Sequence, residues 1–393
     1  MRYPLPLERS PSPSPQPRSR ASRAHTRSIT TRLTVAGAAV VALGALGCSQ
    51  PDDAALRTGS DSVAVERPVP VVAERFITAV DSADNVDGPA VWHGAGGQHW
   101  LLSTAKSTNV VLVNDAATGA PIRRVGGLGA GAGQLSRPNG ITVIGDAALV
   151  VERDNHRVQA FRLPGFTPMG TFGDSILRLP YGITWFEEKP GTYMVYVTDN
   201  YETAEETTPP DAELGERVKQ FRVAIGDAGI RAEHLRSFGD TAGPGVLRVV
   251  ESIVADAAND RLLIAEETEV DSHIKVYDLD GRFSGRVFGR GYFPQQAEGI
   301  ALYACGDRDG YWVTTDQGDS TNTHHLFDRI TLEHVASFTG AETRRTDGVA
   351  LTQVAFGPFP AGAFYASHVD ASIGALSWAE IASAAGVRGD CVR

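Results

Sequence analysis

Residues 298–301, Glu298-Gly299-Ile300-Ala301, belong to a unit that recurs six times along the chain. In each copy a polar or aromatic residue, usually followed by Gly, opens a run of small and β-branched residues. This pattern is typical of a strand that starts at a tight turn. The other copies begin at Asp87-Gly88, Asn139-Gly140, Tyr181-Gly182, Glu251-Ser252 and Asp347-Gly348.

A second predicted strand follows each copy and ends in polar residues, as in Val150-Val151-Glu152-Arg153 and Ile264-Ala265-Glu266-Glu267. A third strand with an aromatic residue comes next in most copies, for example at residues 158–161 and 274–277. Repeats of roughly 40 to 50 residues are those of four-stranded propeller blades. The sequence therefore predicts an all-β fold, a six-bladed β-propeller.

The residue that opens each first strand has a predictable place in such a fold. The first strand of every blade lines the axial channel, so the six opening residues converge on one mouth of it. Four of them are carboxylates: Asp87, Glu251, Glu298 and Asp347. Because desolvated like charges do not gather without a counter-ion, we expect a cation at this mouth.

The charge of the chain is unevenly distributed. Residues 1–47 carry seven Arg and one acid, Glu8, so residues 48–393 carry a formal charge of −17 within the total of −11. An acidic body of this size repels nucleic acid and anionic membranes. We therefore expect no nucleic-acid partner, and a polyanionic substrate would need bridging cations.

The N-terminal segment has the pattern of a bacterial lipoprotein. The apolar run at residues 33–46 is too short to span a bilayer but has the length of a signal-peptide core. We predict a lipoprotein signal peptide with a long basic leader at 1–47, lipidation at Cys48, a linker at 48–68 and the propeller at 69–393. A plain signal peptide and a short buried helix are the alternatives.

The expected location follows from this signal. The chain would be secreted across the inner membrane and held at the outer membrane or cell surface only through the lipid. If Cys48 is lipidated, Cys305 and Cys391 remain as an even pair in an oxidising compartment. We predict a disulfide between them, with two unpaired thiols as the alternative.

Three stretches of the second half carry a family resemblance. They are residues 250–267, which contain Glu251 and Glu267, residues 298–320, and the tail at 346–381. Together they resemble the β-propeller phytases, over nearly the whole body of the chain. The resemblance implies a 3-phytase-type enzyme that releases phosphate from phytate or a related phosphomonoester. It also implies that several Ca²⁺ ions bridge substrate phosphates and acidic residues, and that metal-activated water attacks.

The resemblance assigns roles to individual residues. Lys106 matches a phosphate-binding lysine, Tyr181 a rim tyrosine and Arg153 a phosphate-binding arginine. The positions that match metal ligands are Asp87, Glu251, Glu267, Glu298, Gln317 and Asp347. Adjacent strand residues point to opposite faces, so only one of Glu266 and Glu267 can face the mouth, and spacing favours Glu267. The implied partner is a small phosphorylated molecule, and we expect a monomer.

The chain also departs from the family at three places. Gln296 stands where the family usually has Asp, Gly88 replaces one of two neighbouring aspartates, and the region of Asp199 and Asn200 lacks a second lysine. Each change reduces the charge available to metal or phosphate. The departures put the number of calcium ions and the turnover of phytate in question.

A second pattern competes in blades two to four. Residues 131–141 and 153–161 resemble NHL repeats, which build propellers that often bind partners without chemistry. In that interpretation residues 155–157 form a structural turn and Arg153 has no catalytic role. A non-catalytic NHL-like binding propeller and a single-metal propeller lactonase are therefore the alternative functions. The acidic stretch at residues 202–216 is predicted to be a solvated insertion.

Overall fold

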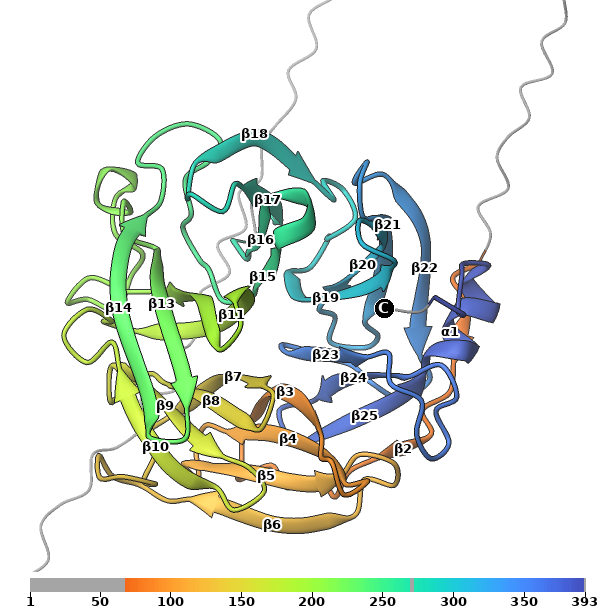
Figure 1. Ribbon diagram of the computed structural model, residues 1–393. Helices are drawn as coiled ribbons and strands as arrows, with labels where there is room; N and C mark the ends of the chain where they lie inside the picture. The colour runs from red at the N-terminus through yellow and green to blue at the C-terminus, as the bar shows by residue number, and fades with distance from the viewer. Residues whose placement is uncertain (1–67, 269–271, 392–393) are drawn as a thin grey trace, which may run out of the picture. The chain divides into compact units, whose positions relative to one another are not determined.

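Six sheets, antiparallel apart from one short edge strand, surround a central axis, as the computed structural model shows (Figure 1). The structure describes residues 68–268 and 272–391, which belong to one compact unit. The fold class predicted from the repeats, a six-bladed β-propeller, is confirmed. The predicted signal peptide, Cys48 and all of the predicted linker except residue 68 lie outside the described residues.

Each blade runs in chain order from an inner strand at the axis to an outer strand. Blade one has β3 (Val86–His93), β4 (His99–Ala105), β5 (Val110–Asp115) and β6 (Pro121–Gly126). Blade two has β7 (Pro138–Ile144), β8 (Ala147–Glu152), β9 (Arg157–Arg162) and β10 (Thr167–Phe172). Blade three has β11 (Pro180–Lys189), β12 (Thr192–Asp199), β13 (Val218–Gly226) and β14 (Gly229–Phe238).

The second half of the chain continues the same order. Blade four has β15 (Ile253–Asp256), β16 (Arg261–Glu266), β17 (His273–Tyr277) and β18 (Phe283–Phe288). Blade five has β19 (Ala297–Cys305), β20 (Asp309–Asp316), β21 (Thr323–Asp328) and β22 (His334–Gly340). Blade six has β23 (Val349–Thr352), β24 (Ala363–His368) and β25 (Ser372–Ser377).

Two short N-terminal strands close the ring. β2 (Phe76–Ile77) pairs antiparallel with β25 and supplies the outer strand of blade six, and β1 (Val71–Val72) pairs in parallel with β22 of blade five. The Phe76 ring packs against the rings of Phe359 and Tyr365, with centroids 6.3 and 6.4 Å away. The first and last blades are thus joined by segments from opposite ends of the sequence.

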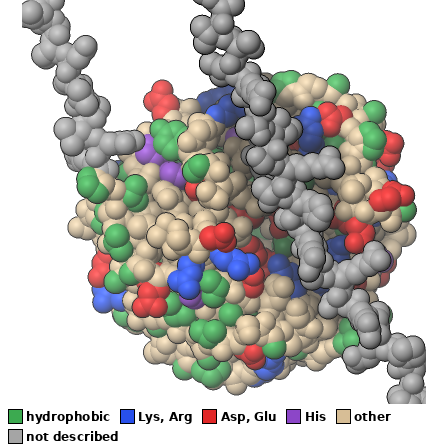
Figure 2. Space-filling view, turned by 180° about the vertical axis from the view of Figure 1, so that it is seen from behind, with side chains coloured by type: hydrophobic (Ala, Val, Ile, Leu, Met, Phe, Trp, Pro, Cys, Tyr) green, Lys and Arg blue, Asp and Glu red, His purple; other side chains and the backbone are tan. Residues whose placement is uncertain are grey.

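The core lies between neighbouring blades, so the second strand of each blade is buried on both faces over most of its length. Every residue of β8 is buried, and Leu102 of blade one packs in the same cluster as Val150 and Phe161 of blade two. This two-sided burial explains why second strands read as continuous apolar runs rather than as alternating ones. Large exposed apolar side chains of the described residues occur singly, and Figure 2 shows apolar and charged groups interspersed on the face in view.

The helical segments are short. They are η1 (Asp211–Glu213), η2 (Ala257–Asn259) and α1 (Trp378–Ala385), and no helix of the described part is long and apolar enough to cross a membrane. After α1 the chain returns to blade five. There Cys391 forms a disulfide with Cys305 at the end of β19, with the two Cα atoms 4.7 Å apart.

Glycines let neighbouring inner strands approach closely at the axis. A Cβ atom on Gly140 would lie 2.4 Å from the carbonyl oxygen of Tyr181, and one on Gly182 would lie 1.9 Å from that of Glu251. Both distances are too short for any side chain, so only Gly permits this contact between blades. The recurrent Gly of the sequence therefore marks where one blade touches the first residue of the next.

A buried acid ends the second strand of blades two to five. These residues, called the staple acids below, are Glu152, Asp199, Glu266 and Asp316. Each accepts hydrogen bonds from backbone N–H groups of the segment just before the inner strand; Glu266, for example, binds the amides of Arg248 and Val249 at 2.9 and 3.0 Å. The staple acids thereby hold the backbone that leads into each channel-lining strand.

Three staple acids also have a buried cation on the third strand. The partners are Arg157 for Glu152 at 2.7 Å, Lys219 for Asp199 at 3.8 Å and Lys275 for Glu266 at 2.8 Å. Because these charges are almost fully removed from water, losing one member leaves the other buried and uncompensated.

We predict that Lys275→Met lowers the free energy of unfolding by about 3–5 kcal/mol, because it leaves the buried charge of Glu266 without its cationic partner. Urea unfolding measures this loss. The matched control is Arg282→Met, which removes an exposed arginine that pairs with Asp280 at 3.0 Å, and it should leave stability unchanged. An equal loss in both variants would show that the buried pair does not stabilise the blade.

Candidate active site

The opening residues of the inner strands meet at one mouth of an axial channel, called the mouth below. The channel has a volume of about 1140 Å³, and its lining includes Asp87, Tyr181, Glu251, Glu298 and Asp347. The sequence predicted this convergence. The sixth opening residue, Asn139, is fully buried, and both polar atoms of its side chain lack a hydrogen-bond partner among the described residues.

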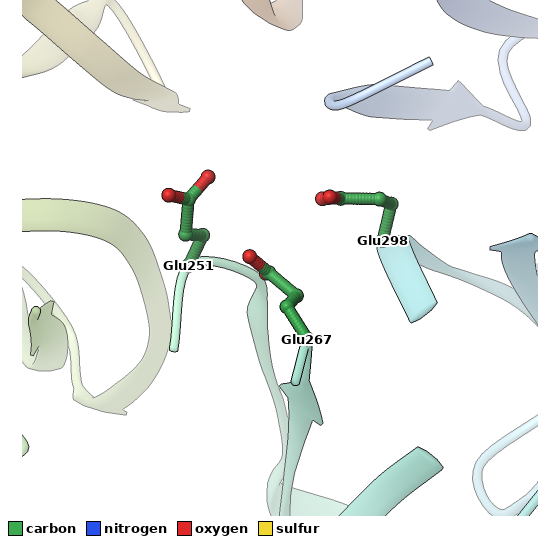
Figure 3. Close-up of side chains that lie close together, drawn as sticks. All are labelled: Glu251, Glu267 and Glu298. Atoms are coloured by element: carbon green, nitrogen blue, oxygen red, sulfur yellow. The ribbon is translucent and has the colours of Figure 1, made fainter. Parts of the chain in front are cut away.

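Three glutamates form a cluster on one side of the mouth. Glu251 and Glu298 open blades four and five, and Glu267 directly follows β16. Each offers one carboxylate oxygen, and these oxygens lie within 4.8 Å of one another; Figure 3 shows the carboxylates directed toward a common space. The Oε1 atom of Glu267 is buried and has no hydrogen-bond partner in the described part of the chain.

Burial and mutual repulsion disfavour the charged forms of these carboxyls. Burial, with added repulsion from Asp87, raises the pKa of Glu251 to about 8 and that of Asp347 to about 7. The pKa values of Glu267 and Glu298 are also raised well above the usual range of a carboxyl, by burial and then by the neighbouring glutamates. A cation among these oxygens would remove the repulsion.

A lysine and its partners form the other side of the mouth. Nζ of Lys106 lies 3.2 Å from Oδ2 of Asp87 and 3.6 Å from Oδ2 of Asp347, and it donates a hydrogen bond of 3.2 Å to the Tyr181 hydroxyl. The amide of Gln317 donates to Asp347. Burial lowers the pKa of Lys106, but the surrounding carboxylates outweigh it and the net shift is upward, so the ammonium stays charged.

The residue after the second strand has the same backbone position in blades one to five. Its N–H donates to the carbonyl of the residue two places before the opening residue of the same blade, at 2.9–3.1 Å. The five residues placed in this way are Lys106, Arg153, Asn200, Glu267 and Gln317. Four of the nine predicted catalytic and metal-site residues therefore occupy the same backbone position, each in a different blade.

Adjacent acids on blade four have different surroundings. Glu266 is a staple acid whose oxygens are bonded to backbone amides and Lys275, whereas Glu267 belongs to the mouth cluster. The structure thus places Glu267, the residue favoured by strand alternation and spacing, beside Glu251 and Glu298.

Arg153 has different neighbours from Lys106. Its guanidinium lies 3.2 Å from Asp154 and 4.0 Å from Glu202 of the acidic insertion. The following NHL-like residues build the turn into β9, because Asn155 and Arg157 both bind the staple acid Glu152. The structural role that this pattern suggests for residues 155–157 therefore agrees with the contacts.

The departures from the phytase pattern have local consequences. A Cβ on Gly88 would lie 3.1 Å from the carbonyl oxygen of Asn139, which leaves little room for a side chain there. Asn200 occupies the backbone position where blade one has Lys106, and its side-chain oxygen accepts a long hydrogen bond of 3.4 Å from Val250. Gln296 uses its backbone N–H and carbonyl to bind Asp316 and Gln317.

The fold and this site together define a six-bladed propeller with a carboxylate-rich channel mouth. Residues 223–369 match the family model described as Phytase, so the predicted resemblance to the β-propeller phytases is confirmed. The matched stretch contains Glu251, Glu267, Glu298, Gln317 and Asp347. It supports a phytase-like hydrolase that acts on a small phosphorylated substrate.

The other comparisons add little. None of the curated proteins compared with the chain matches it. Among solved structures, hydrazine synthase from Kuenenia stuttgartiensis is similar at 14% sequence identity and a TM-score of 0.43, over 72% of this chain and 74% of that one. A similarity of this strength carries no argument about function.

The raised pKa values predict a pH-dependent stability of the metal-free protein. Glu251 and Asp347 have ordinary pKa values of 4.5 and 3.8, against about 8 and about 7 in the fold. The folded chain therefore keeps protons that the unfolded chain has lost, so stability is greatest below the ordinary values and falls as the pH rises through 7 and 8.

We expect the melting temperature in a chelator to decrease between about pH 5 and about pH 9, and calcium to restore it at the upper end. Glu251→Gln should flatten the decrease. A melting temperature that is constant or rises over this range in the chelated protein would contradict the raised pKa values.

Proposed function

We propose that this chain is a calcium-dependent phosphomonoesterase of phytase type. The observation that carries the proposal is the cluster of Glu251, Glu267 and Glu298, whose oxygens lie within 4.8 Å of one another. Opposite it lies the charged Lys106. The two sides of the mouth combine carboxylates that suit a hard cation with an ammonium that suits a phosphate.

The donor set fits calcium. Ca²⁺ takes six to eight oxygen ligands from carboxylates, amides and water in flexible geometry. Glu251, Glu267 and Glu298 would hold it on one side, and Asp87, Asp347 and Gln317 supply further oxygens on the other. The buried Oε1 of Glu267 has no hydrogen-bond partner among the described residues, so an oxygen is available for a metal.

When bound, calcium ions would supply the positive charge that phosphate oxygens require and would activate water. The chain's own groups bind and orient the substrate. Lys106 presents a compact positive charge at the mouth, where it can bind a phosphate oxygen. Burial, followed by the charge of Asp87, raises the pKa of the Tyr181 hydroxyl, so this group remains a hydrogen-bond donor at the same place.

The substrate class follows from charge. Residues 48–393 carry −17, so an anionic ligand binds weakly unless cations bridge it to the mouth. A substrate with several phosphates gains most from such bridging, because each group can interact with an ion or with Lys106. This requirement supports phytate or a closely related polyol phosphate as the substrate.

We predict that purified protein releases phosphate from phytate with calcium and not with excess chelator. Glu251→Gln should lower kcat/KM by on the order of 100-fold, as expected for the loss of one electrostatic group at a reacting centre. Lys106→Met should weaken substrate binding and raise KM. The matched control Glu188→Gln, at the far end of β11 from the mouth, should leave both constants unchanged.

Metal analysis at phosphate saturation separates this proposal from its alternatives. Several calcium ions per chain, fewer in Glu251→Gln, support the phosphatase. One ion per chain would favour the lactonase, and no bound ion together with no phosphate release would favour a non-catalytic binding propeller.

We also propose that the protein is exported and anchored by a lipid on Cys48. The signal-like run at residues 33–46 supports export, and the Cys305–Cys391 disulfide is the kind of bond that persists in oxidising compartments.

The anchor can be tested in cells that express the full chain. We expect the protein in the membrane fraction, labelled by a radioactive fatty acid, and we expect Cys48→Ser to remain unlabelled and move to the soluble fraction. Cys305→Ser is the control for loss of a cysteine and should keep the label. A soluble, unlabelled native chain would rule out the anchor.

A further inference from the structure

An acidic insertion lies beside the mouth and binds arginines on its rim. It comprises residues 201–216 between β12 and β13, and we call it the strap. Residues 202–216 contain six acids and no basic residue: Glu202, Glu205, Glu206, Asp211, Glu213 and Glu216. The sequence predicted a solvated insertion, and most residues of the strap are exposed, but Leu214 is fully buried with Tyr201 and Val246 and packs the strap onto the propeller.

The base of the strap is firmly anchored. Arg217, which is fully buried, donates to the backbone carbonyls of Asp199, Tyr201, Leu247 and Arg248. Its guanidinium carbon lies 4.5 Å from the centre of the Tyr201 ring. These bonds join blade three to the segment that leads into blade four, so they fix the position of both ends of the strap on the propeller.

The acids of the strap bind arginines at equivalent positions of two blades. Arg178 and Arg248 each stand three residues before an opening residue of the mouth, Tyr181 and Glu251 respectively. Arg248 makes a two-pronged pair with Asp211, with distances of 2.9 and 2.7 Å, and Arg178 lies 2.8 Å from Glu216.

The two pairs that the strap acids make with Arg178 and Arg248 are weaker than the buried contacts of Arg217. The side chains of Arg178 and Glu216 are 54% and 50% exposed, and those of Arg248 and Asp211 are 35% and 42% exposed. Ion pairs with this much contact with water are weak and screened by salt. Glu216 also accepts a hydrogen bond of 3.0 Å from the buried Lys219, which holds this acid in place when Arg178 leaves it. An anion with several charges can therefore compete with the strap for these arginines without unfolding it.

The geometry also matches phosphate recognition. The fork of a guanidinium binds carboxylate and phosphate oxygens in the same two-pronged way. Three residues span at most about 11 Å of chain, so one ligand with several phosphates can reach both the mouth and these arginines. They would supply positive charge beside blade three, where Asn200 stands at the position that Lys106 has in blade one.

We propose that Arg178 and Arg248 form an outer anion-binding site of the mouth, and that Asp211 and Glu216 of the strap occupy it in competition with a polyphosphorylated ligand. The inference rests on the proposed function for its substrate class. The strap thereby sets the affinity for ligands with many phosphates, whereas a small monoester would reach only the inner groups.

Binding of phytate in the presence of a chelator tests this site apart from calcium and turnover. Isothermal titration calorimetry at low salt should show that Asp211→Asn/Glu216→Gln binds phytate roughly 3- to 30-fold more tightly than the native chain, the gain from two weak exposed pairs. Adding Arg178→Gln/Arg248→Gln to this variant should abolish the gain.

The matched control is Glu188→Gln/Asp280→Asn. It also removes two acids that pair with arginines, Arg222 and Arg236. Glu188 lies at the end of β11 opposite to the opening residue Tyr181, and Asp280 lies in the turn between β17 and β18, at the opposite end of blade four from Glu267. An equal gain in this control, or a gain that survives loss of Arg178 and Arg248, would overturn the site in favour of a general charge effect.

Two further measurements keep the result interpretable. Melting temperatures show whether the strap variants are folded. If Glu216→Gln does not fold, the test is Arg248→Gln in the otherwise native chain, which must bind phytate more weakly. Unchanged phytate binding by Arg248→Gln would overturn the proposal. Because no calcium is present, a protein that binds phytate as expected here but releases no phosphate with calcium would contradict only the proposed function.

Discussion

The close approach of the inner strands at the propeller axis determines the rest of the site. Gly140 and Gly182 touch the carbonyl groups of the next blade at distances where no Cβ fits. This contact draws the first residue of each inner strand toward the axis. The carboxylates among these residues must then share one small, poorly hydrated space, whatever their mutual repulsion.

Glu266 and Glu267 are neighbours in the sequence but have opposite surroundings in the fold. Glu266 is stabilised within its own blade by backbone amides and Lys275, and it holds the segment that leads into β15. Glu267 points into the mouth, where its carboxylate joins Glu251 and Glu298 and one oxygen lacks a partner among the described residues. The satisfied acid stabilises the fold, and the unsatisfied one is free to bind a cation. The same alternation that builds the strand thus separates an acid that is bonded within its own blade from an acid that faces the mouth.

The two sides of the mouth differ in their relation to known proteins. The glutamate side lies within residues 223–369, which match the Phytase family model, whereas Asp87, Lys106 and Tyr181 lie before that stretch. Lys106 nevertheless contacts Asp347 of the matched part, so the site is continuous across the ring. The strap adds a feature of this chain, because its acids compete for positive charge that a phosphorylated ligand would also use.

The sequence by itself determined the features that depend on local repetition. Strand alternation and the recurrent Gly predicted six inner strands and the residues that open them at the mouth, because each follows from a short pattern within one blade. The choice of Glu267 over Glu266 needed strand alternation together with the spacing of the family resemblance. Other features required the tertiary structure. The closure of the ring by β1 and β2 and the pairing of Asp211 with Arg248 join segments that no short pattern links. Arg153, to which the family resemblance assigns a phosphate-binding role, lies 3.2 Å from Asp154 and 4.0 Å from Glu202. Such contacts depend on which blades become neighbours, and only the closed ring decides that.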